Sequence, residues 1–194
     1  REGMAQMAQT LRTLRESPIP LACKTGSPQR SEGYYVGSTY KHYTNAAMQA
    51  GTAYEHKILD ALGVKTRDRQ IKVYALRLRV NYDGDDAQTV TEVKTYSKAP
   101  FKVSRAYWMQ CQVEMFASGW GLRRRKACRI AAYPVGEAEK QNFFLPVDPG
   151  RISLWPIEYD ETWVEEKYLP RLRYLATCLK IGRWPRKEEV PCSR

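Results

Sequence analysis

The stretch DGDDAQTVTEVK, residues 83–94, decides the fold of this chain. Its first four residues, DGDD, are typical of a tight turn between two strands, and the following residues 88–96 predict a strand. Successive side chains on a strand point to opposite faces, so Glu92 and Lys94 share one face and Val93 takes the other. The stretch therefore predicts an acidic turn leading into a strand that ends with a carboxylate beside a lysine.

Carboxylates and a lysine gathered at the end of a strand can hold a divalent metal ion and steady an attacking water. Mg²⁺ prefers hard oxygen ligands and keeps several waters, so one or two carboxylates per ion suffice. Hydrolysis of a phosphodiester uses such a metal-bound nucleophile. The alternative is that Glu-x-Lys stands on a strand by chance and that DGDD is only a turn, and the rest of the chain decides between the two.

The charge of the chain favours a polyanionic partner. The 194 residues include 32 basic and 21 acidic ones, which gives a net charge of +11. Nucleic acid fits this balance better than an acidic membrane surface. The densest basic run is Arg123-Arg124-Arg125-Lys126, for which phosphate contact and a solvated loop are both open. No apolar run approaches the ~20 residues of a membrane span, and no signal-peptide pattern stands at the start, so we expect a cytoplasmic protein.

The cysteines argue against a disulfide framework or a cysteine-based metal centre. There are five, an odd number, and no Cys-x-x-Cys pair occurs. Reduced thiols in a cytosol fit this usage best.

The order of the expected elements predicts an α/β fold, with a central mixed sheet flanked by helices. Helices are expected at 1–16, 46–62, 104–118 and from a cap at Asp160 to Gly182. Strands are expected at 70–82, 88–96, 127–134 and 141–147. We expect a single domain over 1–194, with a loop-rich segment at 17–45, a core at 46–182 and a tail at 183–194.

Two helical residues extend the candidate site. Glu55 shares a helix face with apolar residues, and a charge there is costly unless it is paired or binds metal; a partly exposed glutamate near Lys57 is the alternative. Gln110 lines up with Tyr107 and Glu114 on the helix at 104–118, while a glutamine two positions later faces elsewhere. Its amide could hydrogen-bond a water or a phosphate oxygen, or could simply be a polar position on a helix.

Taken together, four motifs resemble the PD-(D/E)XK nucleases, and among them the lambda exonuclease or YqaJ type of phage recombination exonuclease. The motifs are GTAYE at 51–55, YDG at 82–84, EVK at 92–94 and YxxQxQxxM at 107–115. The resemblance covers about residues 30–182, and its most specific part is the YxxQxQ helix soon after the EVK strand. It implies a restriction-endonuclease-like core, dependence on Mg²⁺ with Mn²⁺ as a substitute, and degradation of duplex DNA from an end.

The resemblance also implies roles for single residues. It makes Asp83 and Glu92 metal ligands, with the Val93 carbonyl as a third, and it makes Lys94 the group that orients and activates the water. Asp85 and Asp86 stay open as alternatives to Asp83, because the acidic turn holds three aspartates.

It further implies that Glu55 completes the acidic site and that Gln110 positions the nucleophile or the lysine. Arg30 and Ser38 are the candidates for holding a terminal 5′-phosphate. Tyr107 and the basic residues Arg123, Arg124 and Arg125 are the remaining candidate DNA contacts. The segment between Lys94 and Tyr107 is shorter than in the family.

The sequence therefore predicts a Mg²⁺-dependent exonuclease that degrades linear duplex DNA, 5′ to 3′, to give single strands for phage-type recombination. The implied partners are DNA ends, a single-strand annealing protein and further copies of the chain in a trimer, without a membrane. Three alternatives stay open: an endonuclease of the same fold, such as a restriction enzyme or junction resolvase; a non-catalytic basic DNA-binding module; and a structural subunit of a phage particle.

Overall fold

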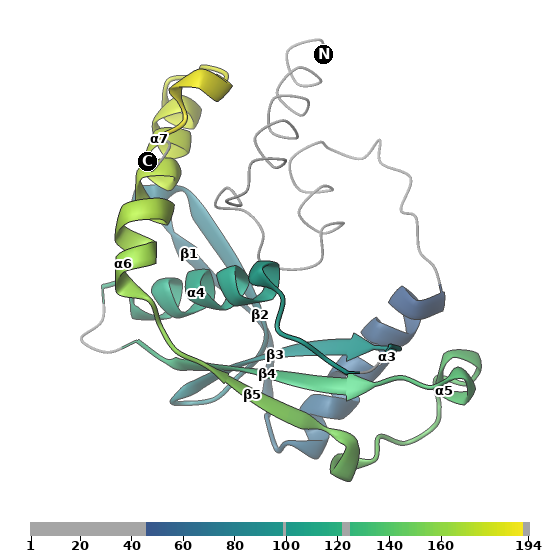
Figure 1. The fold of residues 1–194 in the computed structure, drawn as a ribbon. Helices are drawn as coiled ribbons and strands as arrows, with labels where there is room; N and C mark the ends of the chain where they lie inside the picture. The colour runs from purple at the N-terminus through teal and green to yellow at the C-terminus, as the bar shows by residue number, and fades with distance from the viewer. Residues whose placement is uncertain (1–45, 99, 122–124, 192–194) are drawn as a thin grey trace. The chain divides into compact units, whose positions relative to one another are not determined.

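The computed structural model describes residues 46–98, 100–121 and 125–191 (Figure 1). The helix expected at 1–16 and the loop-rich segment at 17–45 lie outside these residues. The described residues divide into two compact units, one holding residues 46–70 and 81–159 and the other holding 71–80 and 160–191. The single domain over 1–194 stays a prediction. None of the helices described has the length and apolar content needed to cross a bilayer.

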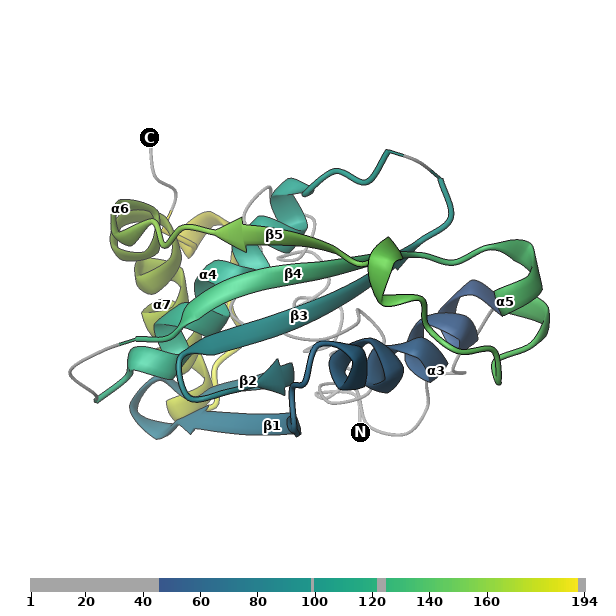
Figure 2. The same ribbon diagram turned by 90° about the horizontal axis from the view of Figure 1, so that it is seen from below.

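A five-stranded sheet runs in the order β1-β2-β3-β4-β5 (Figure 2). The strands are β1 Thr66–Val73, β2 Leu78–Asp85, β3 Thr89–Tyr96, β4 Ala127–Pro134 and β5 Ser153–Ile157. β3 pairs with β4 in parallel, while β2 with β3 and β4 with β5 are antiparallel. The sheet is therefore mixed, and the predicted α/β class is confirmed.

Two helices cover opposite faces of β3 and β4 (Figures 1 and 2). On one face, α3 (Ala46–Ala61) packs Tyr54 and Ile58 into a core cluster with Val93 and Tyr133. On the other face lies α4 (Arg105–Gly119), which is capped by the Ser104 hydroxyl just before its first residue. The alternation predicted for residues 92–94 thus sends Val93 into the α3 core and leaves Glu92 and Lys94 on the α4 side.

The expected strand at 70–82 is two strands. A 3₁₀ turn, Tyr74–Leu76, separates β1 from β2 and ends with Arg77 in the left-handed region at φ 49°. The apolar alternation of the sequence changes phase here, between Val73 and Leu76, which is the mark of a turn that a strand-only interpretation missed.

The expected strand at 141–147 is wrong. A short helix, α5 (Glu137–Gln141), is followed by irregular chain, and the edge strand β5 comes later. Phe143 and Val147 do alternate toward the interior, where both pack against the α3 core cluster. They do so without a partner strand, so period-two hydrophobicity alone gave a false strand. β5 contains Pro156, which is tolerated at a sheet edge.

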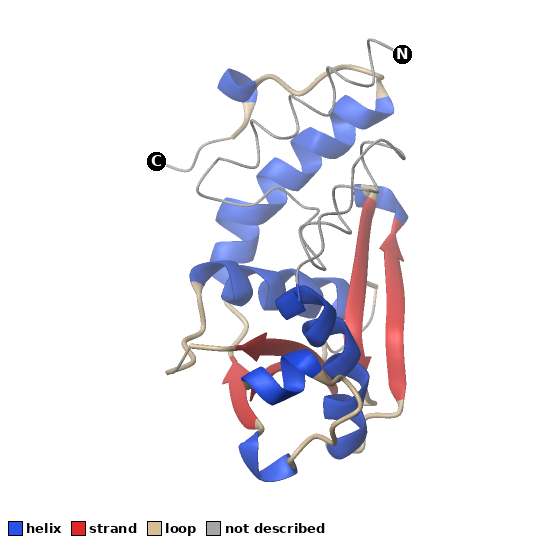
Figure 3. Cartoon of the chain, turned by 90° about the vertical axis from the view of Figure 1, so that its right-hand side faces the viewer, coloured by secondary structure: helices blue, strands red, loops and turns tan. Residues whose placement is uncertain are grey.

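The C-terminal helix of the second unit has three parts in sequence: α6 (Glu161–Trp163), a π-helical turn (Val164–Tyr168) and α7 (Leu169–Lys180) (Figure 3). The predicted cap is confirmed, because Asp160 Oδ1 accepts a hydrogen bond of 2.8 Å from the Trp163 amide. Pro170 has no N–H and would clash with the carbonyl four residues before it, and the π turn gives the chain the extra room.

Gly84 allows β2 to approach α3 beside the acidic turn. A Cβ there would collide with Leu59 Cδ2 and lie 3.0 Å from Val64 Cγ1. We expect Gly84→Ala to lower the free energy of unfolding by about 1–3 kcal/mol, because both neighbours are packed in the core. Urea unfolding measures this. In a double-mutant cycle with Leu59→Ala the two losses should not add, since the second change removes the clash. Full additivity would contradict this explanation.

Candidate active site

The centre of the candidate site is an ion pair on β3. Lys94 Nζ donates to Glu92 Oε1, as the shared strand face predicts. Glu92 is 1% exposed. Its other oxygen, Oε2, is buried and accepts no hydrogen bond from the described residues. Burying a carboxylate oxygen without a hydrogen-bond donor costs free energy, and a bound cation would offset that cost.

Asp83 brings a second carboxylate to this point from β2. Its Oδ2 accepts a hydrogen bond of 2.9 Å from the Val93 amide, so the carboxyl lies beside the strand that carries Glu92 and Lys94. The structure thus brings Asp83, Glu92, Val93 and Lys94 together, as the sequence predicted.

The turn predicted at 83–86 begins later, because β2 runs to Asp85 and the chain turns over residues 86–88. The other two aspartates of the DGDD stretch are engaged elsewhere. Asp85 is buried in ion pairs with Arg69, at 2.9 Å, and with Lys126. Asp86 Oδ1 closes the turn by accepting from the amides of residues 88 and 89, at 2.8 and 2.7 Å. Of the three alternatives, Asp83 is therefore the aspartate next to Glu92.

α4 adds an amide and a third carboxyl from above the sheet. Gln110 Nε2 donates to Glu114 Oε1 over 3.0 Å, and both side chains are buried. Gln112 turns away, as expected, and donates to the Glu158 carbonyl over 2.7 Å. The sequence predicted only that Glu114 lies beside Gln110 on the helix, and it assigned Glu114 no role. Its separation of four residues from Gln110 on one helix face was the signal for the pair.

Crowding changes the protonation of these groups. Burial raises the pKa of Asp83 well above its usual value, and the charges of Glu92 and Glu55 raise it further. Burial and the charge of Glu92 likewise raise the pKa of Glu114. Burial alone would lower the pKa of Lys94, but the Glu92 and Asp83 charges outweigh it, so the pKa lies above its usual value. The site therefore favours protonated carboxyls around one ammonium until a cation replaces the protons.

Glu55 reaches the edge of the site from α3. It is half-buried, and its charge acts on Asp83. Its carboxylate also belongs to an outer group with His56 and Asp68, whose ligand atoms all lie within 4.8 Å of one another. His56 Nε2 and Asp68 Oδ2 are 3.0 Å apart. The charge of Glu55 thus acts on the cluster from its margin, and its role in the site stays a prediction.

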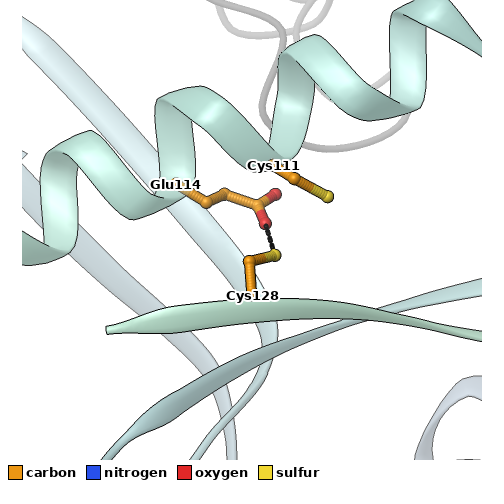
Figure 4. Close-up of side chains that lie close together, drawn as sticks. All are labelled: Cys111, Glu114 and Cys128. Carbon is orange, nitrogen blue, oxygen red and sulfur yellow. Dashed lines mark hydrogen bonds between the residues drawn. The ribbon is translucent and has the colours of Figure 1, made fainter. Parts of the chain in front are cut away.

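Two cysteines lie next to Glu114, which the sequence did not indicate. Cys111 on α4 and Cys128 on β4 flank the carboxyl in a fully buried group (Figure 4). Cys128 Sγ is 3.8 Å from Glu114 Oε2. A hydrogen bond with Cys111, then burial, raises the pKa of the Cys128 thiol well above its usual value. Structural zinc sites use four ligands, and in the described part of the chain this group supplies three.

The donor set around Glu92 differs from the cysteine group. It consists of carboxylate oxygens from Asp83 and Glu92, with Glu55 at the margin. Together with the orphaned Glu92 Oε2, such an all-oxygen set fits a hard divalent cation.

The predicted DNA contacts are only partly described. Tyr107 lies at the site, with its ring centroid 5.0 Å from Lys94 Nζ. The Arg125 guanidinium stacks over the Tyr159 ring at 3.9 Å. Arg30, Ser38, Arg123 and Arg124 lie outside the described residues, and their roles remain predictions.

Comparison with known proteins supports the fold. No family model and no curated protein matches the chain. Among solved structures, a candidate exonuclease from Eubacterium rectale matches with a TM-score of 0.51 and 9% identity, over 98% of this chain and 88% of that one. LHK-Exo in complex with dAMP matches with a TM-score of 0.48 and 19% identity, over 92% and 91%. The match to the Eubacterium rectale structure agrees with the mixed α/β fold described above.

The raised carboxyl pKa values predict how stability depends on pH. In chelator, the folded protein should keep protons on Asp83 and Glu114 above their usual pKa values of 3.8 and 4.5, where the unfolded chain has released them. The unfolded state then binds fewer protons, so the free energy of unfolding falls as pH rises from about 5 toward the raised values. Asp83→Asn, which cannot ionise, should flatten this slope in urea unfolding.

Asp86→Asn is the matched control. Burial acts to raise the pKa of Asp86, but hydrogen bonds from the Gln88 and Thr89 amides outweigh it and lower the pKa. The stabilisation that ionised Asp86 contributes is complete above pH about 5. The Asp86→Asn variant should therefore show the native dependence of the free energy of unfolding on pH above that value. Stability that rises with pH in chelator would contradict the protonated cluster.

Proposed function

We propose that this chain is a metal-dependent deoxyribonuclease that hydrolyses phosphodiester bonds. The observation that carries the proposal is the buried Glu92, with one oxygen lacking a donor among the described residues and the other paired to Lys94, next to Asp83. The net charge of +11 suits a nucleic-acid substrate. The name of the Eubacterium rectale neighbour, a candidate exonuclease, agrees with this chemistry.

In the proposed mechanism, Asp83, Glu92 and the Val93 carbonyl would hold the metal, and the metal would supply a water nucleophile at neutral pH and a counter-charge for the phosphate. Lys94 keeps its proton between two carboxylates. With its proton in place, it is positioned to orient and activate the attacking water and to oppose charge on the phosphate. Glu55 adds negative charge at the margin and helps to retain the cation.

Gln110 positions the nucleophile or the lysine, and Glu114 holds Gln110. The 3.0 Å bond to Glu114 Oε1 fixes the amide so that its carbonyl oxygen stays available. Glu114 is thus a positioning residue in this proposal, acting through its neighbour.

The proposed substrate is the end of linear duplex DNA, degraded 5′ to 3′ with Mg²⁺, for which Mn²⁺ substitutes. Arg30 and Ser38 receive the terminal 5′-phosphate, while Tyr107 and Arg123 to Arg125 contact the strand. The product strands serve phage-type recombination with an annealing protein in a bacterial cytoplasm, and the active assembly is a trimer. An endonuclease of the same fold is the second candidate, because the same catalytic residues can cleave DNA from an end or within a duplex.

We expect Glu92→Gln, Asp83→Asn and Lys94→Met each to lower the cleavage rate by at least about a hundredfold, because each removes a group that acts as part of one unit. The assay follows 5′-labelled linear duplex and closed circular DNA, with Mg²⁺ and with chelator. Loss of linear DNA alone, with the 5′ label released first, supports the exonuclease.

Glu137→Gln is the control, because Glu137 is an exposed acid on α5 that pairs only with Lys140 among the ion pairs described. It should cleave at the native rate. Nicking of the circle would favour the endonuclease, and full activity of Glu92→Gln would overturn the active-site assignment.

The role of Glu114 is tested by a conservative and a truncating variant. Glu114→Gln keeps an oxygen to accept from Gln110, so we expect kcat within about threefold of native. Glu114→Ala leaves the amide without its acceptor, and we expect kcat to fall about tenfold or more with KM unchanged. Equal losses in both variants would show that the carboxylate itself is required, as a ligand would be.

A further inference from the structure

The connection between the catalytic strand and α4 is basic. Residues 93–113 contain four basic side chains, Lys94, Lys98, Lys102 and Arg105, and no Asp or Glu. The last three of these are exposed, and Lys94 belongs to the candidate active site. This segment therefore carries a run of positive charge outward from the ion pair on β3.

The same segment supplies three rings of an aromatic row, and β5 supplies the fourth. Phe101 lies at its centre, with ring centroids 5.2 Å from Tyr96, 6.4 Å from Tyr107 and 5.8 Å from Trp155. The rings of Phe101 and Tyr107 are nearly parallel, at 7°. Tyr107 in turn lies over Lys94, with 5.0 Å from Nζ to the ring centroid. The row thus runs from the catalytic lysine to the edge strand β5.

None of these four rings is buried. Phe101, Tyr96 and Tyr107 are half-buried, and Trp155 is 38% exposed. Phe101 stands on irregular chain between β3 and α4, so no regular element fixes it. A group of aromatic rings that stays open to solvent and is flanked by cations is more than core packing requires, and it marks a binding surface.

Aromatic faces combined with basic side chains are the chemistry that binds an unpaired nucleic-acid strand. Rings stack on bases whose faces are free, and lysine and arginine follow the phosphates. Bases inside a duplex are already stacked on each other, so a duplex would use only the charges. The occupant that fits both features is a short stretch of single strand.

We propose that Tyr96, Phe101, Tyr107 and Trp155, with the basic residues 98, 102 and 105, bind unpaired nucleotides of the DNA strand whose phosphate lies at Lys94. This deepens the proposed function, on which the adjacency to cleavage rests. The row then holds one strand of an opened duplex end next to the carboxylates. Binding of the strand itself does not require cleavage.

The test uses the complete chain in chelator with two fluorescent oligonucleotides of equal length and charge, one of ordinary thymidines and one abasic. Stacking predicts that the thymidine strand binds about five- to a hundredfold more tightly than the abasic strand. Phe101→Ala and Trp155→Ala should remove most of this difference and leave the abasic affinity within about twofold. Phe101→Leu, which keeps apolar packing without a ring face, should behave as Phe101→Ala does.

Two exposed aromatic residues outside the row provide controls. Phe144 is 94% exposed, and Trp120 is 43% exposed near the end of α4. Phe144→Ala and Trp120→Ala should keep the native difference between the two strands. Equal affinity of the native chain for both strands would overturn the proposal, as would row variants that weaken both strands equally.

The two proposals fail in different ways. A preference for the thymidine strand without any cleavage of DNA would support the strand-binding site and contradict the proposed nuclease activity. Cleavage of duplex DNA without that preference would support the nuclease activity and contradict the strand-binding site.

Discussion

The structure around the site depends on one electrostatic constraint. Three carboxyls, from the half-buried Asp83 and the buried Glu92 and Glu114, share a space in which Lys94 is the cation that acts on them most directly. One positive charge cannot balance three negative ones at low dielectric, so protons or a metal must supply the rest. The neighbouring features follow from this: the ion pair on β3, the hydrogen bond that fixes Asp83, and the Gln110 amide that meets Glu114.

The cysteines beside Glu114 fit the same constraint. Cys111 and Cys128 are small, polarisable side chains that fill the space between α4 and β4, and the raised pKa of Cys128 keeps its thiol from adding charge. A third ionised group there would increase the repulsion that Glu114 already experiences. Their place in the molecule is explained by packing next to a protonated carboxyl, while the all-oxygen set around Glu92 has the chemistry for a hard cation.

The sequence predicted which side chains lie together around Glu92, because the signals for their arrangement are local. Alternation along β3 placed Glu92 and Lys94 on one face, and helical spacing aligned Gln110 with Glu114. The choice of Asp83 came from the resemblance, and the engagement of Asp85 and Asp86 with other partners agrees with it.

The sequence failed where the outcome depends on contacts between distant segments. The phase change at residues 74–77 was hidden inside a longer apolar pattern. The alternation around Phe143 and Val147 predicted a strand because both side chains face the core. In the described part of the chain, no strand pairs with this segment. Cys111 and Cys128 meet only because α4 folds over β4, which no local pattern records.

The hydrogen bond from the Val93 amide to Asp83 has a consequence for the energetics of binding. The ladder between β2 and β3 pairs Gly84 with Thr91, and one residue further along the Asp83 side chain takes a backbone donor of β3. The spacing between the two strands' carboxyls is thereby set by the peptide backbone before any cation arrives. Little reorganisation is left for the binding step, and the free-energy cost of holding like charges together falls on folding.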